Sequence, residues 1–85
     1  MKFTATAIEL AYVIDIEPIV DERGFFARAW CREEFRRQGL VAELAQTNIA
    51  WSKERGTLRG LHYLAPPHQE AKLVRCTRGA ALVVV

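Results

Sequence analysis

Short apolar and alternating segments recur along the chain, and turn-forming residues separate them. Residues 2–8, 11–16, 24–30, 44–51, 56–63, 70–77 and 81–85 are either rich in β-branched and aromatic residues or alternate apolar with polar positions. Repeated short strands at this spacing are typical of an all-β sandwich or barrel. The pattern therefore predicts an all-β fold with turns at residues 21–24, 53–56 and 65–68.

One segment departs from the β pattern. Residues 31–40, CREEFRRQGL, contain good helix formers, and Glu33 and Arg37 have the i,i+4 spacing of a helical ion pair. Gly39 stands where a glycine commonly ends a helix. We predict one short surface helix at about residues 31–39.

Length and charge limit the classes of protein that the chain can represent. Its 85 residues suffice for one small domain, and 51% hydrophobic with 26% charged residues indicates a globular chain rather than a disordered one. The net charge of +2 is small, and acidic residues alternate with the basic ones. We therefore expect no nucleic-acid partner, whereas a local site for an anionic ligand remains open.

The two cysteines lie far apart and have no CxxC spacing, and no leader sequence precedes the first predicted strand. We expect a reduced, cytoplasmic protein. The longest apolar run is AALVVV at residues 80–85, far short of a membrane-spanning helix, so we expect no membrane partner.

The chain ends on the apolar, β-branched segment ALVVV at residues 81–85, without a turn or a charge. Native domains seldom leave such a strand edge unpaired, because it is a template for aggregation. We interpret residues 1–85 as the amino-terminal portion of one larger domain, truncated at the carboxyl end. The alternative is a complete small sheet with this strand at its centre.

Residues 57–79 contain the densest group of chemically useful side chains. Strand alternation gives His62 and Lys72 inward positions on two successive segments, so that they can converge. A lone histidine is often structural, and Lys72 has the alternative of an ordinary outward-facing lysine on an edge strand. Arg59 falls on the opposite face from His62 unless the backbone bulges, which Gly60 permits.

Two further positions suggest ligand contacts. Gln46 and Asn48 share one face of a predicted strand, where they can bind a polar ligand or form a buried structural network. Arg23 and Phe26 follow a turn, where arginine can grip a phosphate and an aromatic ring can stack on a base. The alternative for this pair is a surface salt bridge beside a core aromatic residue.

A metal site is disfavoured by the spacing. His62 and His68 are separated by a Pro-Pro turn, and no HxH pair exists on one strand face. We expect His68 to be a turn residue and the site to hold no metal.

The strings DERGFFARAW and QTNIAWSKERGTLRGLHYLAPPHQEAKLVRCTRG resemble the amino-terminal half of the dTDP-4-dehydrorhamnose 3,5-epimerase family. The run TLRGLHY, followed ten residues after its histidine by KLVR, is highly specific. The resemblance implies a cupin-type jelly-roll β-sandwich, a homodimer, and epimerisation of a dTDP-4-keto-6-deoxyhexose at C3 and C5 without a cofactor. It also implies a role in dTDP-rhamnose and O-antigen biosynthesis.

By this resemblance His62 matches the general base and Lys72 the residue that stabilises the enolate oxygen. An imidazole can accept a proton near pH 7, and a cation beside a developing oxyanion lowers the barrier to its formation. The resemblance further implies that the substrate-binding residues are Arg23, Phe26, Gln46, Asn48 and Arg59.

Two positions depart from the family pattern: Arg28 stands where a glutamate is usual, and Thr47 where an aspartate is common. In the family, the second half supplies a tyrosine acid and the acidic partner of the histidine. We therefore expect no turnover by residues 1–85 alone. The competing hypotheses are a non-catalytic cupin-like module, for sugar-nucleotide binding or dimerisation, and a pseudogene product without a stable fold.

Overall fold

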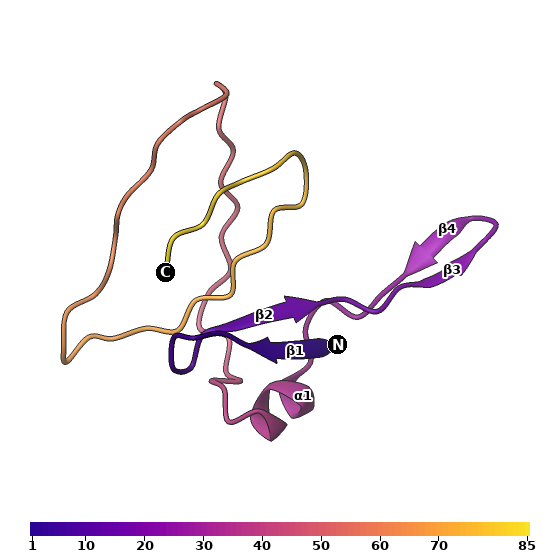
Figure 1. Ribbon diagram of the computed structural model, residues 1–85, viewed down its shortest axis with the longest axis horizontal. Coiled ribbons are helices and arrows are strands. Elements are labelled where there is room, and N and C mark those ends of the chain that lie inside the picture. Colours follow the sequence, from indigo (N-terminus) through magenta and orange to yellow (C-terminus); the bar gives the residue numbers. More distant parts are fainter. The chain divides into compact units, whose positions relative to one another are not determined.

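The first two strands form an antiparallel hairpin in this computed structural model, which describes residues 1–85. β1 is Lys2–Ala5 and β2 is Tyr12–Asp15, with Phe3 opposite Ile14 (Figure 1). Half-buried residues alternate with exposed ones along β2, as a strand with one covered face requires. The predicted strands at residues 2–8 and 11–16 are thus confirmed over their central parts.

A second hairpin follows, made of β3, Ile19–Asp21, and β4, Gly24–Phe26. β4 confirms the start of the predicted strand at residues 24–30. The sequence pattern missed β3, because two apolar residues between Pro18 and a turn are too short to show periodicity. All six residues of this hairpin are exposed.

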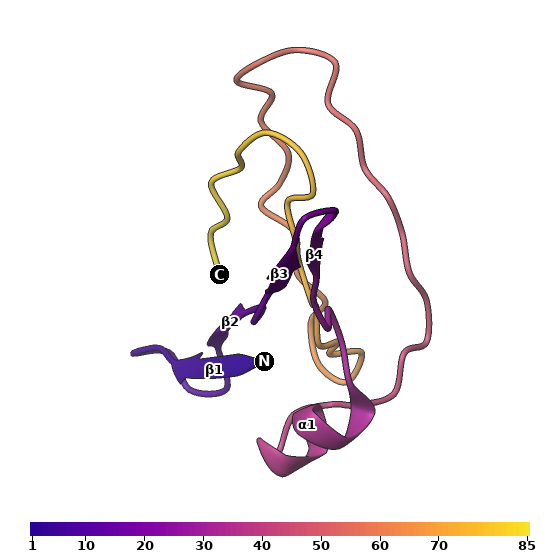
Figure 2. The same ribbon diagram turned by 90° about the vertical axis from the view of Figure 1, so that its right-hand side faces the viewer.

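The predicted helix is confirmed as α1, Arg32–Arg37 (Figure 1 and Figure 2). Gly39, at φ +70°, ends it as expected. Its N–H donates to the Arg36 carbonyl at 3.0 Å, and the Leu40 N–H donates to the Phe35 carbonyl at 3.0 Å. These two bonds make a Schellman motif, which satisfies carbonyls at the end of the helix. The expected Glu33–Arg37 pair is replaced by an i,i+3 pair between Glu33 and Arg36 at 3.4 Å.

Phe35 of α1 forms the centre of the small core in residues 1–45. It is 6% exposed, and its ring lies edge-on to Phe3 of β1 at 5.4 Å between centroids. Trp30 packs beside it at 6.2 Å, and Ala42, the other buried residue, is also 6% exposed. Edge-to-face aromatic pairs add about 0.5–1.5 kcal/mol to the stabilisation from burial itself.

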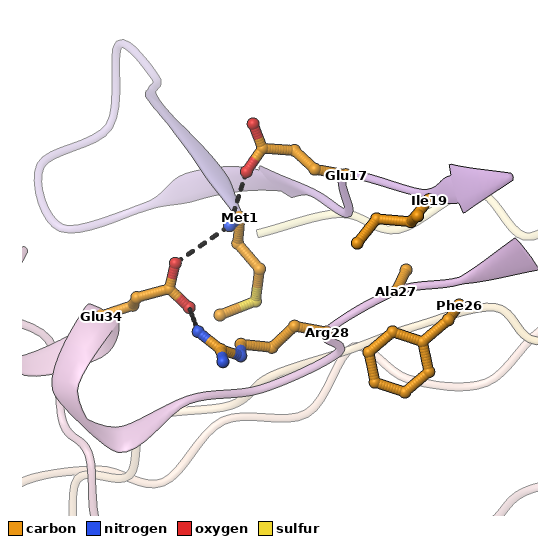
Figure 3. Close-up of a pocket in the computed structure, with 7 residues that line it drawn as sticks. All are labelled: Met1, Glu17, Ile19, Phe26, Ala27, Arg28 and Glu34. Carbon is orange, nitrogen blue, oxygen red and sulfur yellow. Dashed lines mark hydrogen bonds and ion pairs between the residues drawn. The ribbon is translucent and has the colours of Figure 1, made fainter.

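Ion pairs tie the first residue to the helix. The Met1 ammonium lies 2.8 Å from Glu17 Oε2 and 3.0 Å from Glu34 Oε1. The second oxygen of Glu34 lies 3.4 Å from Arg28 Nη1, as Figure 3 shows. The hydrogen bond to Glu17, followed by that to Glu34, raises the pKa of the Met1 ammonium. The bond from Met1 lowers the pKa of Glu34, and Arg28 adds to this effect.

Residues 46–85 form the second of the two units into which the chain divides, and they contain no helix or strand (Figure 1). The strand predictions at residues 44–51, 56–63, 70–77 and 81–85 are therefore wrong for this structure. Every side chain of residues 46–85 is exposed. A strand needs a neighbour to receive its backbone hydrogen bonds, and these segments pair with none. The turns at residues 53–56 and 65–68 are present, the second closed by the His68 N–H donating to the Ala65 carbonyl at 3.0 Å.

The helix α1 lacks the length and the apolar character that a membrane crossing requires.

Replacing Phe35 by alanine should disrupt the packing of α1 on β1. Replacing a buried phenylalanine by alanine costs about 3–5 kcal/mol, so we expect Phe35→Ala to abolish the nuclear Overhauser contacts between α1 and Phe3. Arg37→Ala, on the exposed side of the same helix, should leave them intact. Retention of those contacts in Phe35→Ala would contradict the proposed core.

The ion pair between Met1 and Glu34 should make the stability of residues 1–45 depend on pH at both ends of the range. The Met1 ammonium has a pKa raised above 8.0, so its contribution is complete below 8.0 and is lost as the pH rises through the raised value. Glu34 has a pKa lowered from 4.5, so its contribution is complete above 4.5 and is lost as the pH falls through the lowered value.

The chemical shifts of the α1 amides, followed by NMR against pH, measure this dependence. Glu34→Gln should reduce both transitions without removing either, because Asp21 also has a lowered pKa and Glu17 still pairs with Met1. An unchanged acidic transition in Glu34→Gln would assign that transition to another carboxylate.

Candidate functional site

The turn between β3 and β4 presents Arg23 beside the carboxylate of Asp21. Asp21 Oδ1 accepts a hydrogen bond from the Arg23 backbone N–H at 2.9 Å. Arg23 Nε lies 3.3 Å from each oxygen of the same carboxylate, and Nη2 donates to Oδ2 at 2.6 Å. One acidic side chain thus closes the turn and also holds the guanidinium.

Each charged group of this pair stabilises the ionised form of the other. The Arg23 guanidinium and, to a smaller degree, its backbone N–H hold the pKa of Asp21 below the ordinary value of an aspartate. Asp21 in turn raises the pKa of Arg23. Both groups are therefore ionised near neutral pH, and Arg23, with a side chain 83% exposed, is available to solvent.

Two hollows flank Phe26. A space of about 290 Å³ is lined by Asp21, Arg23, Phe25 and Phe26. A second, of about 270 Å³, is lined by Met1, Glu17, Ile19, Phe26, Ala27, Arg28 and Glu34, and Figure 3 shows the Phe26 ring at one part of it and the paired charges at another. The predicted substrate residues Arg23 and Phe26 thus line the same hollow.

Arg28, one of the two positions that the sequence analysis singled out, belongs to the second hollow. It is bound to Glu34, so the charge introduced at this position is compensated within residues 1–45. Its side chain remains 61% exposed, and it brings a guanidinium to the edge of the space beside Phe26.

The other candidate residues lie in the second unit, residues 46–85. Gln46 and Asn48 are exposed. Arg59 donates from Nε to Ser52 Oγ at 3.1 Å and from Nη2 to the Trp51 carbonyl at 2.8 Å. Arg59 therefore spans the turn at residues 53–56, where Thr57 Oγ1 also donates to the Glu54 carbonyl at 2.6 Å.

Gly60 lies two residues before His62 and close to its side chain. Gly60 has φ +107°, a region that residues with a side chain rarely adopt. A Cβ added at Gly60 would lie 3.3 Å from His62 Nδ1 and 3.4 Å from the His62 backbone nitrogen. The sequence analysis held only that Gly60 permits a bulge between Arg59 and His62, and residues 56–63 form no strand here in which a bulge could occur.

Lys72 is an exposed residue that forms an ion pair with an acidic residue two positions earlier. Its ammonium lies 2.8 Å from Glu70 Oε1, and the two side chains are 51% and 39% exposed. The pair is neutral overall and exposed to solvent, so it stabilises this segment only weakly.

The structure brings some predicted site residues together and leaves others apart. Arg23 and Phe26 share a hollow, whereas no hydrogen bond or ion pair joins any two of Gln46, Asn48, Arg59, His62 and Lys72. No three histidine, cysteine, aspartate or glutamate side chains gather as a metal site would require. The sequence analysis missed Asp21 and Glu70 as partners of predicted site residues, although each lies two positions from the residue that it binds.

Comparison with known proteins gives a consistent result. The sequence model of the family described as dTDP-4-dehydrorhamnose 3,5-epimerase matches residues 5–85. A protein of that name from Sinorhizobium fredii is 38% identical over 80 residues, which are 94% of this chain and 41% of the relative. The protein of the same name from Shigella flexneri is 42% identical over 74 residues, covering 84% of this chain and 40% of its own.

A third relative is named as a 3-epimerase and not as a 3,5-epimerase. The dTDP-4-dehydro-6-deoxyglucose 3-epimerase of Streptomyces bikiniensis is 44% identical over 73 residues, which are 81% of this chain and 36% of that protein. The chain thus spans about two fifths of the length of the curated relatives that it matches. No solved structure matches it.

The family match covers nearly the whole chain and includes the segments that carry His62 and Lys72. The chain belongs to the dTDP-4-dehydrorhamnose 3,5-epimerase family.

Proposed function

We propose that this chain carries the proton-abstraction residues of an epimerase that converts dTDP-4-dehydro-6-deoxy-D-glucose to dTDP-4-dehydro-L-rhamnose. The observation that carries the proposal is the family match over residues 5–85, which spans His62 and Lys72. The names of the relatives from Sinorhizobium fredii and Shigella flexneri support inversion at both C3 and C5.

The match to the family assigns separate roles to the two residues. C3 and C5 flank the C4 ketone, so loss of a proton from either carbon leaves its electron pair on the C4 oxygen as an enolate. His62 accepts the proton, and the Lys72 ammonium stabilises the negative oxygen. Return of a proton to the opposite face of the same carbon inverts it and restores the ketone, with no oxidation or reduction.

The other candidate residues are assigned to substrate binding. Arg23 and Phe26 line one hollow, which supports their assignment to the diphosphate and the base of the nucleotide. Gln46, Asn48 and Arg59 are assigned to the sugar and its diphosphate by their match to the family. Arg59 is held by Trp51 and Ser52, which restricts its side chain before any ligand arrives.

We further propose that the complete domain is a cupin-type jelly roll that works as a homodimer in the cytoplasm. The exposed apolar residues on both faces of the β3–β4 hairpin, Ile19, Val20, Phe25 and Phe26, support the need for additional strands or a second subunit. The free thiols of Cys31 and Cys76 are compatible with a reducing compartment.

A second function is favoured by one observation. Arg23 and Phe26 belong to a formed hairpin, whereas residues 46–85, which include His62 and Lys72, form no strand. This difference favours a non-catalytic module that binds the nucleotide of a dTDP-sugar through residues 1–45.

Exchange of hydrogen for deuterium from solvent at C3 and C5 of the keto-sugar nucleotide, followed by NMR, distinguishes these functions. We expect His62→Ala and Lys72→Ala each to lower the exchange rate about 10²–10⁴-fold, the usual contribution of a general base or an oxyanion partner. His68→Ala and Lys53→Ala are matched controls, because they remove the same side chains from turns.

Exchange that persists in His62→Ala would overturn the assignment of the base. Binding of dTDP without exchange in the unmodified chain would instead support the non-catalytic module.

Substitution of Gly60 should disturb His62 specifically. We expect Gly60→Ala to shift the ring signals of His62 in NMR spectra, because the added methyl group meets the imidazole at 3.3 Å. Gly56→Ala is the control, since Gly56 also has positive φ, at +78°, yet a Cβ there meets nothing within 4 Å. Equal shifts of His62 in both variants would mean that backbone strain, and not the contact, is responsible.

A further inference from the structure

The carboxylate of Asp21 performs two separable tasks in the turn between β3 and β4. Its Oδ1 accepts the Arg23 backbone N–H at 2.9 Å, a side-chain bond that mimics a turn hydrogen bond. Both of its oxygens also contact the edge of the Arg23 guanidinium formed by Nε and Nη2, at 2.6–3.3 Å. The first contact needs only an oxygen, whereas the second depends on the negative charge.

The residues of the turn suit this arrangement. Aspartate is favoured at the first position of a type I turn and glycine at the fourth, and Asp21 and Gly24 occupy these positions. Gly24 has φ +131°, which permits the chain to enter β4 directly after Arg23. Arg23 is thus fixed at the tip of the hairpin by a backbone that the sequence specifies locally.

The guanidinium has five N–H donors arranged as a planar fork. Asp21 occupies the edge made by Nε and Nη2, and it leaves the two Nη1 hydrogens and the outer Nη2 hydrogen unused. The Arg23 side chain is 83% exposed, so this end faces solvent. An oxyanion of suitable width can accept two parallel hydrogen bonds from Nη1 and Nη2.

We propose that Asp21 is a positioning residue, which holds the Arg23 guanidinium so that its Nη1–Nη2 end receives the diphosphate of the nucleotide-sugar substrate. The proposal rests on the function proposed above, in which Arg23 binds that diphosphate. Phe25 and Phe26 line the same hollow as the Asp21–Arg23 pair, so the restrained guanidinium lies beside an apolar surface suited to the less polar parts of the ligand.

If Asp21 has the alternative role of a competitor, removing its carboxylate should change the affinity for an anion in the opposite direction. If its carboxylate merely competed with the ligand for Arg23, its removal would strengthen the binding of an anion. If it positions Arg23, its removal frees a long side chain that must be ordered again on binding, and affinity falls.

The test is a titration of the 85-residue chain with dTDP and, separately, with thymidine, which lacks the diphosphate. Asp21→Asn keeps an oxygen for the Arg23 backbone N–H and loses the charge. We expect this variant to bind dTDP about 3- to 10-fold more weakly, the loss that ordering one long side chain produces. Its affinity for thymidine should be unchanged.

Glu22→Gln is the matched control, because it removes the same charge from the next residue of the turn. It should bind dTDP as the unmodified chain does, or slightly more tightly. Backbone amide signals of Val20 and Phe25, which are paired in the hairpin, verify that each variant retains the turn.

Each other result overturns part of the proposal. Equal or tighter binding of dTDP by Asp21→Asn would overturn the positioning role and leave the proposed function intact. An equal loss of dTDP and thymidine affinity would mean that Asp21 acts only on the hairpin fold. Undiminished binding of dTDP by Arg23→Gln would overturn the role of Arg23 itself, and the positioning role with it.

Discussion

The described packing of residues 1–45 depends on the burial of one aromatic ring. Phe35 is one of two buried residues in the chain, and the rings of Phe3 and Trp30 pack against it. Because α1 has only six residues, it is too short to be stable as an isolated helix. The helix exists because Phe35 anchors it, and Glu34 can reach Met1 and Arg28 because the helix exists.

Local signals were sufficient to predict the features that local chemistry determines. The helix was predicted from its composition and from Gly39, and the turns from Asp21 and Gly24 at one place and from Pro66 and Pro67 at another. The strand predictions within residues 44–85 were wrong, because alternation indicates only that a segment suits a sheet. Whether it forms one depends on a partner strand, and the segments from Leu44 to Val85 have no partner in this structure.

The candidate site shows the same difference between local contacts and contacts that need long-range pairing. Arg23, with its neighbour Asp21, acquires a defined arrangement from two residues of a single turn, and Lys72 acquires Glu70 from two positions away. A convergence of His62 with Lys72 would require two strands in register, which is a property of long-range pairing and not of either segment. Contacts within a single turn can therefore be predicted from the local sequence, whereas contacts between separate segments cannot.

The uncovered hairpin has a thermodynamic consequence. Ile19 and Phe26 form one exposed cross-strand pair and Val20 and Phe25 the next, so the two strands gain little from burial on their own. Any molecule that binds the paired strands but not the extended chain shifts the equilibrium by mass action, by about 2.7 kcal/mol at a hundred times its dissociation constant. The fraction of chains in which this hairpin is formed therefore depends on the concentration of such a binding molecule as well as on the sequence.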